Sequence, residues 1–356
     1  MTDSKNIEKL TAEAVELLRE MVSIPSPSFH EDAVCSHISN WLTAKGVEHE
    51  RVGNNIIAEH IVDPSKPTLM LCAHIDTVVP CEGYTFDPYK PENCPTDMIQ
   101  GLGSNDDGAS AVSMIAAFRF FGTCTTIPNI TLVLTCEEER SGKGGMTGLW
   151  GKRLNRIDYA IVGEPTGMKA ATSERGLLVI DATAHGVSGH AARNEGKNAL
   201  YIALEDIERL RKHEFTKVSP KMGRVNLNVT QICAGSAHNV IPDRCDFVID
   251  IRPTEQYSNE EILQELQAIC ESELKPRNLA NRSSATKEDS PLQKTAERMG
   301  IETFSSATTS DWMRITCDAI KMGPGESTRS HRKDEFVYID EVRNAIEIYI
   351  EFIEKI

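Results

Sequence analysis

The apolar positions of the chain follow a helical period in six stretches. In the first stretch, Leu10, Ala14, Leu17, Leu18 and Met21 recur at helical spacing, with charged residues between them. This spacing gathers the apolar side chains on one face of a helix. The same pattern predicts helices over residues 7–22, 30–42, 109–121, 198–213, 258–274 and 341–356.

Two other patterns predict strands. Short apolar runs predict buried strands over residues 68–73, 130–135, 159–162 and 318–322, and residues 55–61 read as extended chain. Apolar and polar positions alternate over residues 177–184, 224–233 and 245–251, which is typical of strands with one face in water. The order of these elements predicts an α/β domain that is interrupted by an inserted α+β domain, with the polar residues 275–289 as the return linker.

Ionisable side chains follow the buried strands. His74 and Asp76 come after the first strand, Glu137–Glu139 after the second and Glu164 after the third. In open α/β sheets, ligands bind beside the carboxyl ends of the strands. The pattern therefore predicts a functional site at that edge of the sheet.

Composition excludes some partners. The chain has 356 residues, 38 Lys and Arg against 53 Asp and Glu, and a formal net charge of −15. This charge disfavours nucleic acid and anionic membrane surfaces as partners. We see no apolar stretch of about 20 residues that could span a membrane and no secretory signal. The 10 Cys are scattered singly, which fits reduced thiols in the cytoplasm and gives no support to a disulfide or redox protein.

Each candidate residue has an ordinary explanation when it is taken alone. A histidine at a strand end is usually a satisfied core or surface residue, a run of Glu is usually solvated, and Asp106 and Asp107 could complement a helix dipole. A buried edge that collects all of them must neutralise their charge. His and carboxylate without Cys suit Zn²⁺, Co²⁺ or Mn²⁺, and there are enough donors for two ions.

Five motifs carry a resemblance to a known family. They are residues 74–77 (His-Ile-Asp-Thr), 101–107 (Gly-Leu-Gly-Ser-Asn-Asp-Asp), 135–139 (Thr-Cys-Glu-Glu-Glu), 162–165 (Val-Gly-Glu-Pro) and 323–325 (Gly-Pro-Gly) running on to His331. The chain resembles the zinc aminoacylase/carboxypeptidase metallopeptidases, in the branch of acetylornithine deacetylase and succinyl-diaminopimelate desuccinylase. The motifs occur in the family's order and span nearly the whole chain.

The resemblance implies the domain structure and the metal ligands. We expect a mixed-sheet catalytic domain with helices on both faces, formed by residues 1–173 and 285–356, and a ferredoxin-like lid and dimerisation domain over residues 174–284. One metal ion would be held by His74, Asp106 and Glu164. The other would be held by Asp106, Glu139 and His331, with Asp106 as the bridge. Asp76 would orient His74, and Glu138 would be the general base.

The resemblance also assigns residues in the inserted domain. His190 would reach the active site of a partner subunit in a homodimer, where it would stabilise the oxyanion. Asn239 and Arg252 match the family's lid residues near the substrate carboxylate. Without the resemblance, His190 reads as a loop histidine and Arg252 as a surface ion pair, and His185 and His238 keep such ordinary readings.

Three departures from the family pattern leave questions open. Many relatives have Lys where this chain has Gly108, and the segment from His74 to Pro80 is one residue longer. The three consecutive Glu also allow two registers. Either Glu138 is the base and Glu139 a ligand, or Glu137 is the base and Glu138 the ligand.

The expected function is a cytoplasmic metal-dependent amidohydrolase that removes a small acyl group from an amino acid. N-acetylornithine, within arginine biosynthesis, is the first choice, and its succinyl form is an option. Succinyl-diaminopimelate desuccinylase and a di- or tripeptidase are the alternatives within the family. A non-catalytic, metal-stabilised binding protein is the alternative from another class.

Overall fold

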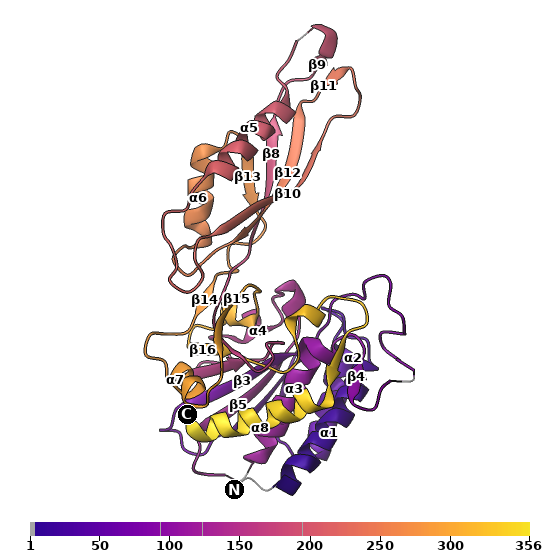
Figure 1. Cartoon of the computed structure of the whole chain (residues 1–356), viewed down its shortest axis with the longest axis vertical. Helices are drawn as coiled ribbons and strands as arrows, with labels where there is room; N and C mark the ends of the chain where they lie inside the picture. Colours follow the sequence, from indigo (N-terminus) through magenta and orange to yellow (C-terminus); the bar gives the residue numbers. More distant parts are fainter. Residues whose placement is uncertain (1–3, 93, 123, 194) are drawn as a thin grey trace. The chain divides into compact units, whose positions relative to one another are not determined.

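The structure of the chain, a computed structural model, describes residues 4–92, 94–122, 124–193 and 195–356 (Figure 1). They form two compact units. The first unit comprises the chain up to Thr172, Ala285–Phe304 and Ser310–Ile356, and the second comprises Ser173–Ser284 and Ser305–Thr309. The predicted fold class is confirmed, because a mixed α/β unit is interrupted by an inserted α+β unit.

The first unit contains a mixed sheet of nine strands within the described residues. Its central strands are parallel to one another, and its outer strands pair antiparallel with them. In sheet order they are β1 (Glu50–Val52), β2 (Asn55–His60), β5 (Asn129–Thr135), β3 (Thr68–His74), β6 (Tyr159–Val162), β16 (Asp318–Lys321), β7 (Ala170–Glu174) and β14 (Ser284–Ala285), while β15 (Thr303–Ser306) pairs with β7.

Side chains of the central strands alternate between two apolar layers. Leu69 and Leu71 of β3 join the larger core cluster, whereas Met70 and Cys72 join a smaller cluster on the other face. This two-sided burial explains why the central strands appear in the sequence as continuous apolar runs. In the larger layer, α3 packs against both α1 and α8 (Figure 1). This layer holds α1 (Ser4–Val22), α2 (Asp32–Ala44), α3 (Ala109–Phe120), α7 (Pro291–Arg298) and α8 (Ile339–Lys355). The smaller layer holds α4 (Met146–Leu149) and the 3-10 helix η4 (Asp311–Arg314).

The second unit is a four-stranded antiparallel sheet with two helices on one face. Its elements follow the order β8 (Leu178–His185), α5 (Ala199–Lys212), β10 (Asn226–Ala234), β12 (Arg244–Arg252), α6 (Asn259–Ile269) and β13 (Glu273–Pro276). The sheet order is β10-β12-β8-β13. This is the βαββαβ arrangement of a ferredoxin-like fold. A small separate ribbon, β9 (Gly189–His190) with β11 (Val240–Ile241), extends the unit beyond β8.

One element boundary predicted from the sequence is wrong. The helix expected to run to Leu274 ends at Ile269, and the residues expected to begin the return linker belong to β13, which pairs with β8. The buried carboxylate of Asp206 accepts hydrogen bonds from the backbone N–H and the hydroxyl of Ser272, at 2.8 and 2.6 Å. These bonds hold the chain out of the helix and lead Leu274 into the core under the sheet.

Several short elements had no clear sequence signal. They include β7, β14 and β15 of the main sheet, and the ribbon of β4 (Met98–Gln100) with β17 (Phe336–Tyr338). Strands of two to five residues are too short for a periodic pattern to establish itself. No helix within the described part of the chain is long and apolar enough to cross a membrane.

Candidate active site

Four neighbouring parallel strands end at the same edge of the main sheet. β5, β3, β6 and β16 are adjacent in that order, and Cys72 of β3 is in register with both Val133 and Val162. Because these strands are in register, the segments that follow them begin next to one another at the edge of the sheet. His74 ends β3, the three Glu follow β5, Glu164 follows β6, and the segment with His331 follows β16.

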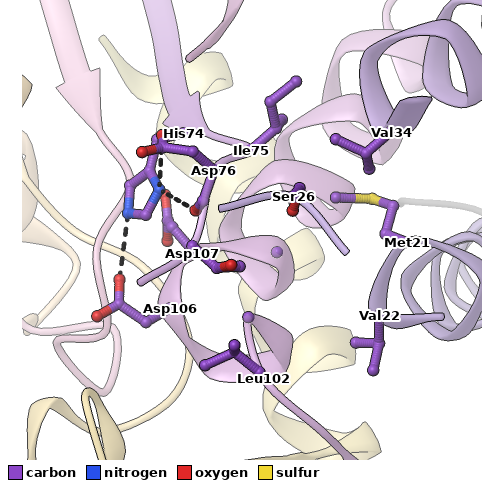
Figure 2. Close-up of a pocket in the computed structure, with 13 residues that line it drawn as sticks. Met21, Val22, Ser26, Val34, His74, Ile75, Asp76, Leu102, Asp106 and Asp107 are labelled. Atoms are coloured by element: carbon purple, nitrogen blue, oxygen red, sulfur yellow. Dashed lines mark hydrogen bonds and ion pairs between the residues drawn. The ribbon is translucent and has the colours of Figure 1, made fainter. Parts of the chain in front are cut away.

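His74 lies in the middle of the resulting cluster. Its Nε2 is 3.2 Å from Oδ1 of Asp106, and its Nδ1 is 2.9 Å from the backbone oxygen of Asp76. Figure 2 shows the His74 imidazole between these two residues, facing a pocket whose other wall is apolar. His331 approaches the same cluster, with its Nε2 2.9 Å from Oε1 of Glu139 and 3.6 Å from Oδ2 of Asp106.

Donor atoms converge in two groups at this cluster. In one group, ligand atoms of His74, Asp106 and Glu139 all lie within 4.8 Å of one another. In the other group, the same holds for His74, Glu138 and Glu164. His331 adds a further nitrogen beside Glu139. The structure thus gathers the five expected metal ligands and the expected base in one place.

The three consecutive glutamates face different surroundings. Glu137 has a φ of 60°, in the left-handed region, and its carboxylate accepts a hydrogen bond from the N–H of Gly144 at 2.8 Å. Glu138 and Glu139 begin a 3-10 helix, η2 (Glu138–Arg140), and their carboxylates belong to the two donor groups. This geometry favours the register in which Glu138 and Glu139, rather than Glu137 and Glu138, face the site.

Asp76 is fully buried and holds the segment after β5. Its two oxygens accept hydrogen bonds from the N–H groups of Glu138 and Glu139, at 3.0 and 3.2 Å, and from the hydroxyl of Ser28 at 2.7 Å. Its carboxylate is 3.6 Å from Nδ1 of His74, farther than its own backbone oxygen. Asp76 therefore positions the backbone of two site residues as well as facing the imidazole.

The candidates in the second unit lie at two ends of its sheet. His190 and Asn239 are close together, because β9 pairs with β11 and the N–H of Ala191 donates to the backbone oxygen of Asn239 at 3.0 Å. His190 is exposed. Arg252 ends β12, whose first residue pairs with His185 near the ribbon, so the nine-residue strand separates Arg252 from the ribbon by roughly 25 Å. The structure does not bring Arg252 together with His190 and Asn239 within one chain.

Arg252 is held by its own strand. Its Nε and Nη2 donate to the two oxygens of Asp250, at 2.9 and 3.1 Å. This bidentate pair fixes the guanidinium plane and leaves Nη1 for other acceptors.

The second unit matches a family model. Residues 172–278 match the M20 peptidase dimerisation domain. Relatives align over nearly the whole chain. A succinyl-diaminopimelate desuccinylase of Wolbachia pipientis is 27% identical, with 96% of this chain and 92% of the relative covered. An acetylornithine deacetylase of Proteus mirabilis is 26% identical, with 91% of each chain covered.

Solved structures share the fold. Aminopeptidase PepT of Bacillus cereus superposes with a TM-score of 0.78 at 19% identity, covering 97% of this chain and 98% of that chain. A dinuclear metal binding peptidase of the M20 family from Bacillus subtilis has a TM-score of 0.75 at 16% identity, covering 98% of this chain and all of the other.

The chain carries the dimerisation domain of M20 peptidases and is similar over nearly its whole length to deacylases and peptidases. The predicted resemblance is thereby confirmed, and so is the predicted enzyme class, because these relatives are hydrolases that act on amide bonds.

The crowded carboxylates of the site favour bound cations. Burial, together with the neighbouring carboxylates, raises the pKa of Glu138 and of Glu164 well above their usual range. Burial would lower the pKa of His74, but its hydrogen bonds to Asp106 and Asp76 raise that pKa well above the usual value. The hydrogen bond to Glu139 raises the pKa of His331 to about 8. In the metal-free protein, these glutamates and histidines therefore keep their protons to higher pH than the same groups do in water.

These donors fit divalent metal ions. The set contains only imidazole nitrogens and carboxylate oxygens, which are the donors of catalytic zinc, cobalt and manganese sites. A bound cation would replace the extra protons and remove the cost of crowding buried carboxylates. The chemistry of the site therefore suits bound divalent cations.

Two buried acids beside the site, Asp311 and Glu335, were missed at the sequence level, and a third, Asp107, was assigned no role there beyond that of a helix-dipole acid. Asp311 accepts a hydrogen bond from the Thr135 hydroxyl at 2.7 Å, and burial raises its pKa to about 6. Burial also raises the pKa of Asp107 to about 8. Glu335 accepts hydrogen bonds from the site backbone, as described below. Neither Asp311 nor Glu335 directly follows a buried strand that the sequence predicts, so only the fold could connect them with the site.

The departure at Gly108 has a local reason. Its N–H donates to the backbone oxygen of Gly103 at 3.0 Å. A Cβ at this position would meet that oxygen and would come within 2.7 Å of Leu18. The tight turn in this chain therefore has no room for a lysine side chain at position 108.

Proposed function

We propose that this chain is a metal-dependent amidohydrolase that removes an N-acyl group from an amino acid, with N-acetylornithine as the first substrate to test, as in arginine biosynthesis. The observation that carries the proposal is the buried cluster of imidazole and carboxylate at the carboxyl ends of β3, β5 and β6. The relative named acetylornithine deacetylase supports the choice of substrate.

Two metal ions, with Zn²⁺ the first choice and Co²⁺ or Mn²⁺ as options, would bind in this cluster. His74, Asp106 and Glu164 would hold one ion. Asp106, Glu139 and His331 would hold the other, so that Asp106 bridges them. The short distances from Asp106 to both imidazoles support its bridging place. Bound metal ions would supply a Lewis acid and an acidified water.

Glu138 would act as the general base. Its buried carboxylate has its pKa raised by its surroundings, which suits a group that must take a proton near neutral pH and return it to the leaving amine. Asp76 would keep Glu138 in place through its backbone N–H. His190 would donate a hydrogen bond to the developing oxyanion, and Asn239 and Arg252 would bind the substrate carboxylate.

A homodimer would explain the exposed residues of the second unit. Tyr201 and Leu204 lie three residues apart on α5 and are 64% and 49% exposed, and Ile232 on the edge strand β10 is 47% exposed. An edge strand next to exposed apolar side chains is a surface on which a second copy can pair. In such a dimer, His190 and Asn239 of one protomer would complete the site of its partner. Changing Leu204 to Glu should yield monomers in sedimentation or light scattering, and an unchanged dimer would contradict this surface.

The ten cysteines are free in the described structure, which supports a reducing compartment such as the cytoplasm.

Removal of a succinyl group from diaminopimelate is a second candidate function, because the Wolbachia relative named succinyl-diaminopimelate desuccinylase aligns over 96% of this chain. A di- or tripeptidase is a third, supported by the fold shared with aminopeptidase PepT.

The deciding experiment is hydrolysis of a small panel. It contains the acetyl and succinyl forms of ornithine and of diaminopimelate, together with a di- and a tripeptide. We expect one acyl-amino acid to be hydrolysed fastest, with activity abolished by a chelator and restored by Zn²⁺. A protein that binds zinc but hydrolyses no member of the panel would favour a metal-stabilised binding protein.

A further inference from the structure

Glu335 lies between the two segments that carry Asp106 and His331. It directly precedes β17, which pairs with β4, and its backbone oxygen accepts a hydrogen bond from the N–H of Gly101 at 2.9 Å. The Asp106 segment begins at Gly101, and His331 lies four residues before Glu335. The residue therefore connects the two segments through its backbone.

The side chain of Glu335 makes a second connection. It is 2% exposed, and its Oε1 accepts hydrogen bonds from the N–H groups of both Asn105 and Asp106, at 2.8 and 3.0 Å. When Glu335 is ionised, these two bonds are charge-assisted, and such bonds are shorter and stronger than neutral ones. They fix the backbone of Asp106 from the side opposite to its carboxylate.

Asn105 reinforces the same junction. Its Oδ1 accepts from the N–H of Glu326 at 3.0 Å, and its Nδ2 donates to the Ser330 hydroxyl at 3.3 Å. Ser330 directly precedes His331, whose φ of 56° lies in the left-handed region. Such a backbone persists only where its surroundings hold it. The Asp106 and His331 segments are therefore held to each other at several points, and Glu335 supplies the buried carboxyl group among them.

We propose that Glu335 is a positioning residue that keeps Asp106 and His331 in place for a shared metal ion. The inference rests on the proposed metal site. Glu335 touches neither His331 nor the Asp106 carboxylate in the contacts described, so it acts through the backbone of Asp106. Supporting carboxylates of this kind typically change metal affinity about 10- to 100-fold when they are removed.

In the test, the full-length protein is loaded with zinc and mixed with a chromogenic chelator. The rate and the extent of zinc transfer to the chelator are measured. Glu335→Ala leaves two buried N–H groups without their acceptor, and we expect about 10- to 100-fold faster or more complete loss of one of two zinc ions. Glu335→Gln keeps an oxygen acceptor without the charge and should show a smaller change in the same direction. Excess zinc should restore much of the turnover of both variants.

Asp318→Asn is the matched control. Asp318 is also buried and accepts a backbone N–H, from Lys287 at 2.9 Å, but it lies at the start of β16, at the end away from the site. Its variant should lose thermal stability and retain both zinc ions.

Wild-type zinc retention in Glu335→Ala would overturn the proposal, and if that variant does not fold, Glu335→Gln decides in the same way. Equal zinc loss in the Asp318 variant would also overturn it, since the effect would then follow from stability alone. A wild-type chain that binds no zinc would instead refute the proposed metal site itself.

Discussion

The two units place their candidate residues in opposite ways. In the first unit, the buried His74 has ligand atoms of both Asp106 and Glu138 within 4.8 Å of its own. In the second unit, His190 is exposed, and Arg252 lies at the other end of the sheet. The first group is already gathered at one place in the structure, whereas the second group is divided between the two ends of its sheet.

The difference follows from how each sheet is built. Parallel strands bring residues from distant parts of the chain to one edge, so that β3, β5, β6 and β16 supply one site together. In the antiparallel sheet of the second unit, consecutive strands run in opposite directions, and their ends alternate between its two edges. In the proposed dimer, a second copy would supply the surface that completes the site of His190.

The largest expected effect tests the buried group. Glu138→Gln removes the proposed base and keeps a side chain of nearly the same shape, so both metal ions should remain bound. We expect turnover to fall by about 100- to 10,000-fold, which is the usual range for loss of a general base. Steady-state rates with elemental analysis check both points, and near-normal activity in this variant would sink the assignment.

Glu137→Gln is the neighbouring control. Its carboxylate binds the N–H of Gly144, away from the two donor groups, so we expect turnover to stay within a few-fold of wild type. If this variant were the inactive one, the other register of the three glutamates would be correct.

The second prediction tests whether the exposed group belongs to another chain. His190→Ala should lower turnover about 100- to 1000-fold, as loss of one oxyanion donor does, without loss of metal. Mixing it with Glu138→Gln under conditions that exchange subunits should restore activity to about a quarter of wild type, because half of the dimers then contain one intact site. His185→Ala, another exposed histidine of this unit, should have little effect. A mixture as inactive as its components would refute shared sites.

Sequence patterns were informative where the chain is regular. The buried strands and amphipathic helices of the first unit were predictable. A strand that is buried on both faces forms a continuous apolar run, and a helix that is buried along one side repeats its apolar residues at helical spacing. The same patterns indicated which edge of the sheet collects His74, the glutamates and Glu164. Their agreement in chain order is what made the family resemblance specific.

The remaining features depend on contacts between distant segments. The end of α6 at Ile269 is set by Asp206, a residue on another helix. Asp311 and Glu335 come to lie beside the site only when the chain folds and brings η4 and β17 next to it. No local periodicity encodes such pairs, so a single sequence leaves them unseen.

The third prediction concerns Arg252 and is smaller. Asp250 occupies two of its donor groups, so the substrate carboxylate would gain only Nη1. Arg252→Lys should therefore raise KM by roughly tenfold, as expected from loss of one hydrogen bond between charged groups, with kcat nearly unchanged. Arg277 forms the same bidentate pair with Asp181 on this unit, so Arg277→Lys is the matched control. An equal effect of both variants would assign the change to stability of the sheet.

The last prediction concerns the pH dependence of the stability of the first unit. Burial raises the pKa of Asp107 to about 8, of Asp311 to about 6 and of Glu335 to about 8. In the metal-free protein these acids bind more protons when folded than when unfolded, so stability must fall as pH rises from about 4 to 8. His331, with its pKa raised to about 8, adds to the fall above its unfolded value of about 6.5.

Bound zinc should flatten this dependence, because a cation favours the ionised carboxylates. The three tryptophans, Trp41, Trp150 and Trp312, all lie in the first unit, so their fluorescence reports its unfolding alone. We expect Tm of the chelated protein to fall by about 2–4 °C for each kcal/mol lost on going from pH 5.5 to 8, and the zinc-loaded protein to change less. Equal pH profiles with and without zinc would mean that these acids do not face the metal site.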